Sequence, residues 1–574
     1  MIDSQSLTRL LDRLDEARRA FGQAGRLREV EELLRLLGRK QFRDSDSLIG
    51  FHEQLLFIRA YPPNSAIFQL AEKLLSSFAE RVNQLLADGT DPTVFDYIEV
   101  SGMAGTTLHG TYSYGIAQWL ARRYSAYVDV EWERYQKTER LAYGLPRFIP
   151  LLDEDSLVEQ NIPYLEWLHS ARAAGSNDLV YLIDCFDRFG GSARDRSRLY
   201  DLLELWISWD LRGTNVSRTL NRTTPRRVFY HTRPLLKRNQ VSLAKEIVAP
   251  LRLRALATAE GQAIIDRCRE TTCVRYRELY GIAYGDPSSV VRAEFGRGVE
   301  IYLWGLPPER RLPLRAYHSG FTLKNGVPIN YIEGITIFER MELGFNTFYT
   351  YREGETAWIY AQALRMLHHI VGVTCFSIDP YQIGFNNQEA LDSGAFWFYR
   401  KLGFRPTRVD LMKIAETEEK KIAGTPGYRT PARVLRKLAE APMIYEVPGS
   451  PKGDWDSFRI RNLGLAVQHR MAREFDGDAD RMRAAAMAEV RRALDLRPRA
   501  FKGVEYEAFA DLALVMALIP DLSIWTRQEK KGVVRVIRAK SGGSDAQYAK
   551  SLQDHSRLRS AIIEIGSRPV KNRR

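Results

Sequence analysis

The chain has 574 residues, 45% hydrophobic and 27% charged, an ordinary composition for a globular protein with a core of normal size, and its length suits about three to four folded domains. Its 84 Lys and Arg residues exceed its 71 Asp and Glu residues and give a net charge of +13, which is compatible with nucleic acid, anionic lipid or phosphorylated ligands as partners. The first residues lack the apolar core of a secretion signal, and the apolar run 512–520 is shorter than the roughly 20 residues that span a bilayer, so we expect a cytoplasmic protein without a transmembrane segment.

The four cysteines indicate neither a disulfide framework nor a metal site. They are sparse for a framework in so long a chain, and no further Cys or His near Cys268 and Cys273 completes a zinc set. We expect reduced thiols and no bound metal, as is usual for a cytosolic protein. The four are Cys185, Cys268, Cys273 and Cys375.

The N-terminal part of the chain carries leucines at helical spacing. Apolar side chains recur three and four residues apart in residues 7–14 and 30–37, and Gly22 and Gly25 separate the two runs, which predicts an antiparallel helical hairpin. Helical patterns continue to about residue 210. We therefore expect residues 1–240 to form a helical N-terminal region.

A strongly basic segment, residues 212–238, holds eight basic side chains and no acidic one. Phe229, Tyr230 and His231 lie among them. Basic groups neutralise phosphates and aromatic rings stack on bases, so the segment either binds nucleic acid or is a loop whose charges are solvated or paired with acidic helices. The basic residues are Arg212, Arg218, Arg222, Arg226, Arg227, Arg233, Lys237 and Arg238.

From residue 298 the pattern changes from helical to alternating. Residues 298–306 and 343–352 are predicted strands, and the alternation around Asn325-Gly326 predicts a β-hairpin. A helix with apolar residues four, three and four apart follows near 355–370, then a buried strand at 371–379 and a helix that Gly403 stops. Hairpin, strand, helix, strand and helix make a layered α/β unit, and helical patterns resume after Thr407.

The junction between the strand 343–352 and the next helix could carry chemistry. A strand that turns into a helix leaves backbone N–H groups unpaired at the start of the helix, and these donors together with the helix dipole suit a phosphate group. Gly354 would permit close approach of a ligand, and Thr356 could add a hydroxyl. Glu353 and Glu355 oppose anion binding unless their side chains point away from the ligand.

The segment that ends this unit resembles the GNAT superfamily of acyltransferases. The family commonly ends its last strand–helix unit in the pattern Asn-x-x-Ala-x-x-x-Tyr-x-Lys-Leu-Gly-Phe; here Asp392 stands at the usual Asn, with Asn386 and Asn387 just upstream. The resemblance covers about residues 300–407 and implies a GNAT-like mixed-sheet domain at 241–410, between the helical regions 1–240 and 411–574. The matching residues are Ala395, Tyr399, Lys401, Leu402, Gly403 and Phe404.

The resemblance implies that the protein moves an acyl group from acetyl-CoA or another acyl-CoA to an amine, which may belong to a small molecule or a protein. The loop amides of residues 352–357 would hold the diphosphate of CoA, and the strand 345–350 would pair with its pantetheine arm. The implied cofactor-binding residues are Phe348, Tyr349, Thr350, Arg352, Gly354, Glu355, Thr356, Ala357, Asn387 and Asp392.

The resemblance also implies an acid and a base. Tyr399 would protonate the departing thiolate, because a tyrosine keeps its proton at neutral pH yet can donate it to a developing anion. A carboxylate would take the proton of the amine, and the candidates on neighbouring strands are Glu333, Glu339 and Glu342.

Each of these residues also has an ordinary structural interpretation. Tyr399 lies among aromatic residues and could be a core side chain, and each glutamate could be a surface or ion-paired residue. The alternative function is a non-catalytic GNAT-like scaffold that binds RNA or DNA through residues 212–238.

Overall fold

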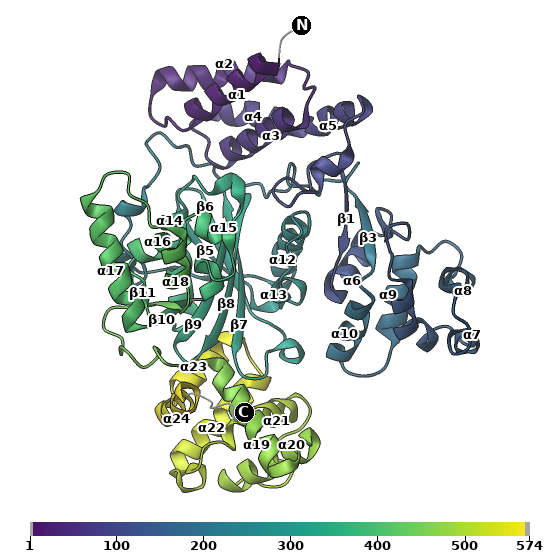
Figure 1. The fold of residues 1–574 in the computed structure, drawn as a ribbon, viewed down its shortest axis with the longest axis vertical. Helices are drawn as coiled ribbons and strands as arrows, with labels where there is room; N and C mark the ends of the chain where they lie inside the picture. The colour runs from purple at the N-terminus through teal and green to yellow at the C-terminus, as the bar shows by residue number, and fades with distance from the viewer. Residues whose placement is uncertain (1–3, 569–574) are drawn as a thin grey trace.

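The computed structural model describes residues 4–568 and is a mixed α/β protein built around a nine-stranded sheet (Figure 1). The strands lie in the order β11-β12-β10-β9-β8-β7-β6-β5-β4. Their bounds are β4 Arg254–Ala255, β5 Val291–Gly296, β6 Val299–Trp304, β7 Ala316–Lys324, β8 Val327–Ile337, β9 Arg340–Thr347, β10 Cys375–Ile378, β11 Arg405–Pro406 and β12 Met443–Glu446.

The β7–β8 hairpin is the longest antiparallel pair of this sheet. Its two-residue turn is Asn325-Gly326, and both residues adopt left-handed backbone angles, with φ of 50° and 78°. Such a turn matches the twist of the flanking strands, which is why Asn-Gly is preferred there. The predicted hairpin is confirmed.

The strands β9 and β10 form the only parallel pair among the paired strands of residues 4–568. Helix α14, Thr356–Val371, connects them, as a crossover between parallel strands requires. Helices α15 Gln388–Asp392, α16 Ala395–Lys401, α17 Val409–Gly424 and α18 Ala432–Leu438 follow. The sheet does not end at residue 410 as the sequence predicts, because β12 lies between β10 and β11.

The N-terminal helices cross the end of the large sheet at which the β7–β8 turn lies (Figure 1). The amide of Asn325 donates a hydrogen bond to the carbonyl of Ala60, and both parts belong to one hydrophobic core. The predicted helical hairpin is confirmed by the first two helices. The helices are α1 Ser4–Arg18, α2 Ala24–Gly38, α3 Ser45–Ala60, α4 Ser65–Ser76 and α5 Phe78–Ala87.

A second α/β unit occupies residues 107–216 and has a hydrophobic core of its own. The prediction of a wholly helical N-terminal region is wrong here, because residues 206–210 alternate between buried and half-buried side chains and form the central strand of a three-stranded sheet. The elements are β1 Thr107–Thr111, β2 Val128–Val130, β3 Trp206–Asp210, α6 Tyr114–Arg123, α7 Leu152–Ser156, α8 Tyr164–Ala171, α9 Asp178–Arg188 and α10 Ala193–Leu203.

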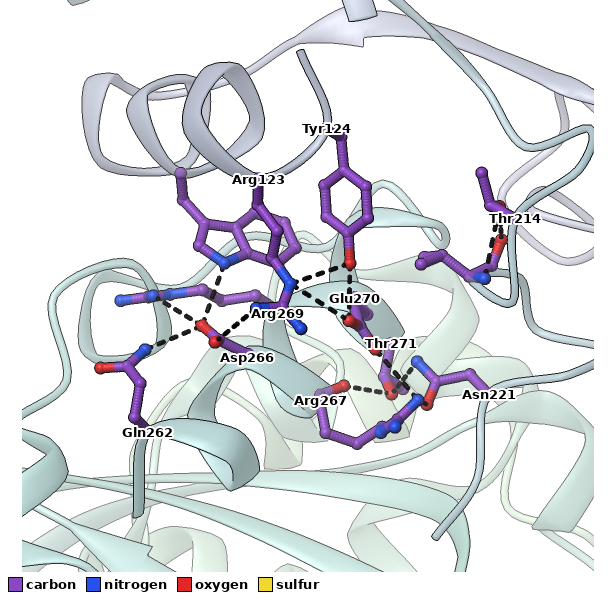
Figure 2. Close-up of polar contacts among 12 residues, drawn as sticks. Arg123, Tyr124, Thr214, Asn221, Gln262, Asp266, Arg267, Arg269, Glu270 and Thr271 are labelled. Atoms are coloured by element: carbon purple, nitrogen blue, oxygen red, sulfur yellow. Dashed lines mark hydrogen bonds and ion pairs between the residues drawn. The ribbon is translucent and has the colours of Figure 1, made fainter. Parts of the chain in front are cut away.

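Helix α12, Thr258–Cys273, joins this unit to the large sheet through a buried polar network (Figure 2). Asp266 accepts a hydrogen bond from the indole of Trp119 at 3.0 Å, and one helical turn later Glu270 accepts one from the hydroxyl of Tyr124 at 2.7 Å. Arg123 lies within ion-pair distance of both carboxylates. Helices α11 Leu243–Glu246 and α13 Tyr280–Ala283 flank α12 in the chain.

The C-terminal helices pack at the other end of the large sheet (Figure 1). The hydroxyl of Tyr548 donates to the carbonyl of Leu314, and the guanidinium of Arg311 donates to carbonyls of residues 539–543. Within residues 4–568, no helix has both the length and the apolar character that a bilayer requires. The helices are α19 Ile460–Phe475, α20 Ala479–Ala493, α21 Val504–Met516, α22 Arg527–Ser541, α23 Asp545–Gln553 and α24 Ser556–Ser567.

Candidate functional site

The junction of β9 and α14 presents an uncapped helix N-terminus. A single 3-10 turn, Tyr349–Tyr351, separates the strand from the helix, and the side chain of the N-cap residue Glu355 makes no capping hydrogen bond. The amides of Thr356 and Ala357 belong to the first turn, where the helix itself offers no carbonyl. This end of α14 therefore retains donors and a positive dipole for an anion.

A cavity of about 480 Å³ lies against this helix end. Its wall combines the junction with the N-terminal helices and with the basic segment 212–238. The lining residues are Arg19, Phe21, Phe57, Pro234, Leu235, Leu236, Lys237, Arg238, Arg352, Glu353, Gly354, Thr356, Ala357 and Phe398. Four of the predicted ligand residues, Arg352, Gly354, Thr356 and Ala357, are thus brought together at one cavity.

The charges of this cavity favour an anion. Within residues 4–568, neither Lys237 nor Arg238 has a carboxylate within ion-pair distance. Arg352 pairs with Glu389 at 2.7 Å and its guanidinium lies over the ring of Tyr349. Glu353 is the one acidic lining residue, and Arg18 and Arg19 of α1 neutralise it at 3.0 and 2.9 Å.

The side chain of Glu355 does not line the cavity, so only its backbone amide remains a predicted contact for a ligand. Its side chain is fully buried beneath the loop, where it accepts hydrogen bonds from Arg297 and from the amide of Leu236, with the ammonium of Lys324 at 3.5 Å. The buried carboxylate thus connects the basic segment, the turn between β5 and β6, and the end of β7 to the start of α14.

Packing within the protein already requires a glycine at position 354. A Cβ added there would lie 2.3 Å from the hydroxyl oxygen of Tyr61, which is closer than any real contact. The ring of Tyr61, at the end of α3, occupies the space beside its α-carbon, and the approach of a ligand to this glycine stays a prediction.

Beyond Glu342, β9 loses its partner on the side of β10. The parallel register ends at the pair Glu342 and Ser377, and the next carbonyl on that side, of Leu343, accepts a hydrogen bond from the side chain of Gln382 at 3.0 Å. Because backbone groups alternate along a strand, the N–H and C=O of Phe345 point to the same side. They suit pairing with an extended amide-bearing ligand.

Tyr399 lies in an aromatic cluster that reaches this part of β9. Its ring is 5.8 Å from that of Tyr360, which in turn is 5.1 Å from that of Phe345. Tyr399 is buried, and the burial raises its pKa well above the usual value, so the hydroxyl keeps its proton. The position is compatible with both interpretations, a core side chain and an acid.

The three candidate bases have different surroundings. Glu339 lies at the start of β9, the end far from the cavity, and is held by Arg559 and by the indole of Trp455, so its prediction as a base is wrong. Glu342 pairs with Arg315 at 2.7 Å and Arg340 at 3.1 Å. Glu333 has no cation within ion-pair distance in the described part of the chain and accepts a hydrogen bond from Tyr317.

The remaining predicted ligand residues have contacts of their own. The amide of Phe348 donates to Ile329, Thr350 donates to Glu53, and Asn387 caps α15. Asp392 is exposed and accepts a hydrogen bond from Gln388. Each of these groups thus already has a partner within the protein, and their assignment to the ligand stays a prediction. The ring of Tyr349 stacks on the guanidinium of Arg352.

Some basic side chains of the segment 212–238 form ion pairs within the protein, and others remain unpaired among the described residues. Arg212 pairs with Asp210, Arg218 is buried against Glu53, and Arg222 pairs with Glu72. Lys237 and Arg238 belong to the same segment, and the sequence did not predict that they would lie beside the β9–α14 junction. Its excess of charge was a signal for anion binding, but not for which element it would join.

Comparisons with models of protein families, with curated proteins and with solved structures find no match to this chain.

Proposed function

We propose that the protein is a GNAT-like acyltransferase that moves an acyl group from an acyl-CoA to an amine. The observation that carries the proposal is the uncapped start of α14 beside a cavity with two unpaired cations, Lys237 and Arg238. A diphosphate needs backbone donors and positive charge at one place, and this junction combines them. The resemblance of residues 392–404 to the family and the β9–α14–β10 crossover support the same proposal.

The unpaired stretch of β9 would hold the pantetheine arm. The amide groups of the pantetheine arm can form hydrogen bonds with the N–H and C=O of Phe345, as an additional strand would. The diphosphate would then lie at the start of α14 and the thioester near the point where β9 and β10 part, at Glu342 and Ser377.

The acid and the base would approach the thioester from opposite faces of the sheet. Glu333 shares a face with its cross-strand partner Gly344, whereas the next residue, Phe345, points to the face that Tyr360 and Tyr399 cover. The amine nitrogen attacks the thioester carbon and the C–S bond breaks. Glu333 takes the proton that the amine loses, and Tyr399 gives a proton to the thiolate.

The decisive experiment measures binding of CoA by calorimetry. Lys237→Glu with Arg238→Glu should weaken binding on the order of tenfold or more, because each charged contact to phosphate contributes about 1.5–3 kcal/mol. The matched control is Arg233→Glu, an exposed basic residue of the same segment outside the cavity wall. If millimolar acetyl-CoA leaves the melting temperature of the unmodified protein unmoved, the proposal fails, since a ligand of the native state must raise it.

A second candidate function, binding of nucleic acid, is favoured by one observation. Arg226 and Arg227 are exposed, pair with no carboxylate in the described residues, and line a cavity of about 730 Å³ together with Phe229 and Tyr230. Binding of this kind must weaken steeply as salt rises. A titration with single-stranded RNA and DNA at two salt concentrations tests it, and the absence of such a dependence rejects it.

A further inference from the structure

Three buried arginines converge where the N-terminal helices meet the β9–α14 junction. Arg59 is the last but one residue of α3, Arg218 belongs to the basic segment, and Arg275 follows α12. Their exposed fractions are 2%, 2% and 4%. All three lie close enough to Tyr351 for their charges to act on its hydroxyl.

The guanidinium groups keep donors without partners. Arg59 donates through Nη1 to the carbonyl of Thr219, but its Nε and Nη2 have no hydrogen-bond acceptor among the described residues. Nε of Arg218 and Nε of Arg275 are likewise buried and unpartnered. Buried donors of native proteins are nearly always satisfied, so each of these needs an explanation.

The local charge is also unbalanced. Glu53 and Glu72 are the carboxylates of the cluster, and four guanidinium groups surround them, those of Arg59, Arg218, Arg275 and the half-buried Arg222. Arg275 has no carboxylate within ion-pair distance in residues 4–568; its Nη1 donates to the carbonyl of Thr271 and its plane lies over the ring of Phe348 at 4.4 Å.

Arg275 is the arginine whose pKa is most affected by burial and by this excess of positive charge. Burial lowers its pKa to about 9, and the positive charges of Arg218 and Arg59 act in the same direction. A buried positive charge is costly unless an anion pairs with it, and Glu53, whose charge acts on Arg275, is already paired with Arg218 at 3.4 Å.

We propose that Arg59, Arg218 and Arg275 bind a small inorganic oxyanion of the phosphate or sulfate type. The planar guanidinium presents paired N–H groups that match two oxygens of a tetrahedral oxyanion. Burial of the three side chains to 96% or more favours a small ion over a larger organic phosphate. The bound ion connects α3, the basic segment and the end of α12 behind Tyr351, and this site is separate from the cavity at the start of α14.

The first test is the melting temperature of the full chain in phosphate and in sodium chloride of equal ionic strength. Phosphate at about 20 mM should raise the melting temperature by roughly 1–2 °C more than chloride does. An equal response to both salts overturns the proposal.

Variants locate the effect. Arg275→Gln should abolish the phosphate-specific rise, whereas Lys237→Glu with Arg238→Glu should keep it, which separates this site from the start of α14. Arg311→Gln is the control for loss of a buried arginine, because its guanidinium donates to carbonyls of residues 306 and 539–543. If Arg275→Gln responds to phosphate like the unmodified protein, the assignment is wrong.

A second measurement does not depend on a variant that folds. Crystals of the unmodified protein soaked in selenate should show an anomalous peak within hydrogen-bond distance of Arg59 and Arg275. A peak only at the start of α14, or none at all, rejects the site.

Discussion

Glu333 of β8 lies directly opposite Gly344 of β9, so its carboxylate has no side chain beside it on the stretch of β9 that β10 leaves unpaired. The hydroxyl of Tyr317 donates to that carboxylate, and no cation pairs with it in the described part of the chain. The carboxylates of Glu339 and Glu342, by contrast, are each held by arginines.

Replacing Glu333 by Gln should lower turnover while leaving the affinity for CoA unchanged. General-base catalysis contributes about 10²–10⁴-fold, so a loss of that size in kcat is expected for transfer to an amine. The loss should shrink as pH rises and the amine deprotonates by itself. Glu342→Gln, on the neighbouring strand, is the control, and equal losses in both variants would deny Glu333 its special role.

Removing the Tyr399 hydroxyl tests the proposed acid. Tyr399→Phe keeps the aromatic contacts with Tyr360 and Phe404, so we expect the fold and the melting temperature to be nearly unchanged and kcat to fall about 10²-fold. Because burial raises the pKa of Tyr399, the proposed activity of the unmodified protein should not decline through loss of this proton below about pH 10. Full activity of the variant would make Tyr399 a core residue only.

Gly354→Ala should destabilise the protein without removing any charge from the cavity. The new methyl group would meet the hydroxyl of Tyr61 at 2.3 Å, and overpacking of this kind costs about 1–3 kcal/mol. Urea denaturation measures the change. Gly424→Ala, at a helix end where a Cβ meets nothing within 4 Å, is the control. Equal stabilities of the two variants would show that the loop moves aside at no cost.

Acid should weaken the attachment of the N-terminal helices through Glu53. Burial acts to raise the pKa of this carboxyl, but Arg218 and hydrogen bonds with His52 and Thr350 outweigh it and lower the pKa from 4.5 to about 2. A carboxyl whose pKa is lower in the folded state than in the unfolded state stabilises the fold at pH values above its unfolded-state pKa. This stabilisation is lost as the pH falls from 4.5 towards 2. We expect a loss on the order of 2 kcal/mol across that range.

The matching variant is Glu53→Gln, which should be less stable than the unmodified protein at pH 7 and less sensitive to acid. Denaturant midpoints at several pH values between 2 and 7 give both slopes. If the stability of the two proteins changes with pH in the same way, protonation of Glu53 is not coupled to folding.

Local sequence patterns predicted the elements whose conformation depends mainly on residues close together in the chain. Asn325-Gly326 encodes its turn through two residues that tolerate left-handed angles, and the apolar spacing of residues 359–370 encodes α14. The strand β12 escaped prediction because its four residues are too few to show alternation. Its place in the sheet depends on pairing with β10 and β11, which no local pattern reports.

Only the part of the candidate site that lies in one continuous segment could be predicted from the sequence. The strand–helix junction is one continuous segment, so a sequence pattern can report its free amides. Lys237 and Arg238 reach it through the packing of the basic segment between the N-terminal helices and the sheet, which is a long-range arrangement. For the same reason the sequence did not show that Glu355 turns inward to Arg297 and Lys324.

The placement of β12 bears on how the chain matures during synthesis. Until residues 443–446 leave the ribosome, β10 and β11 remain open edges that cannot pair with each other. Exposed strand edges recruit other chains, so the nascent protein passes through a period of vulnerability while α17 and α18 emerge. A chain that terminates before Met443 should therefore aggregate rather than yield a smaller folded protein.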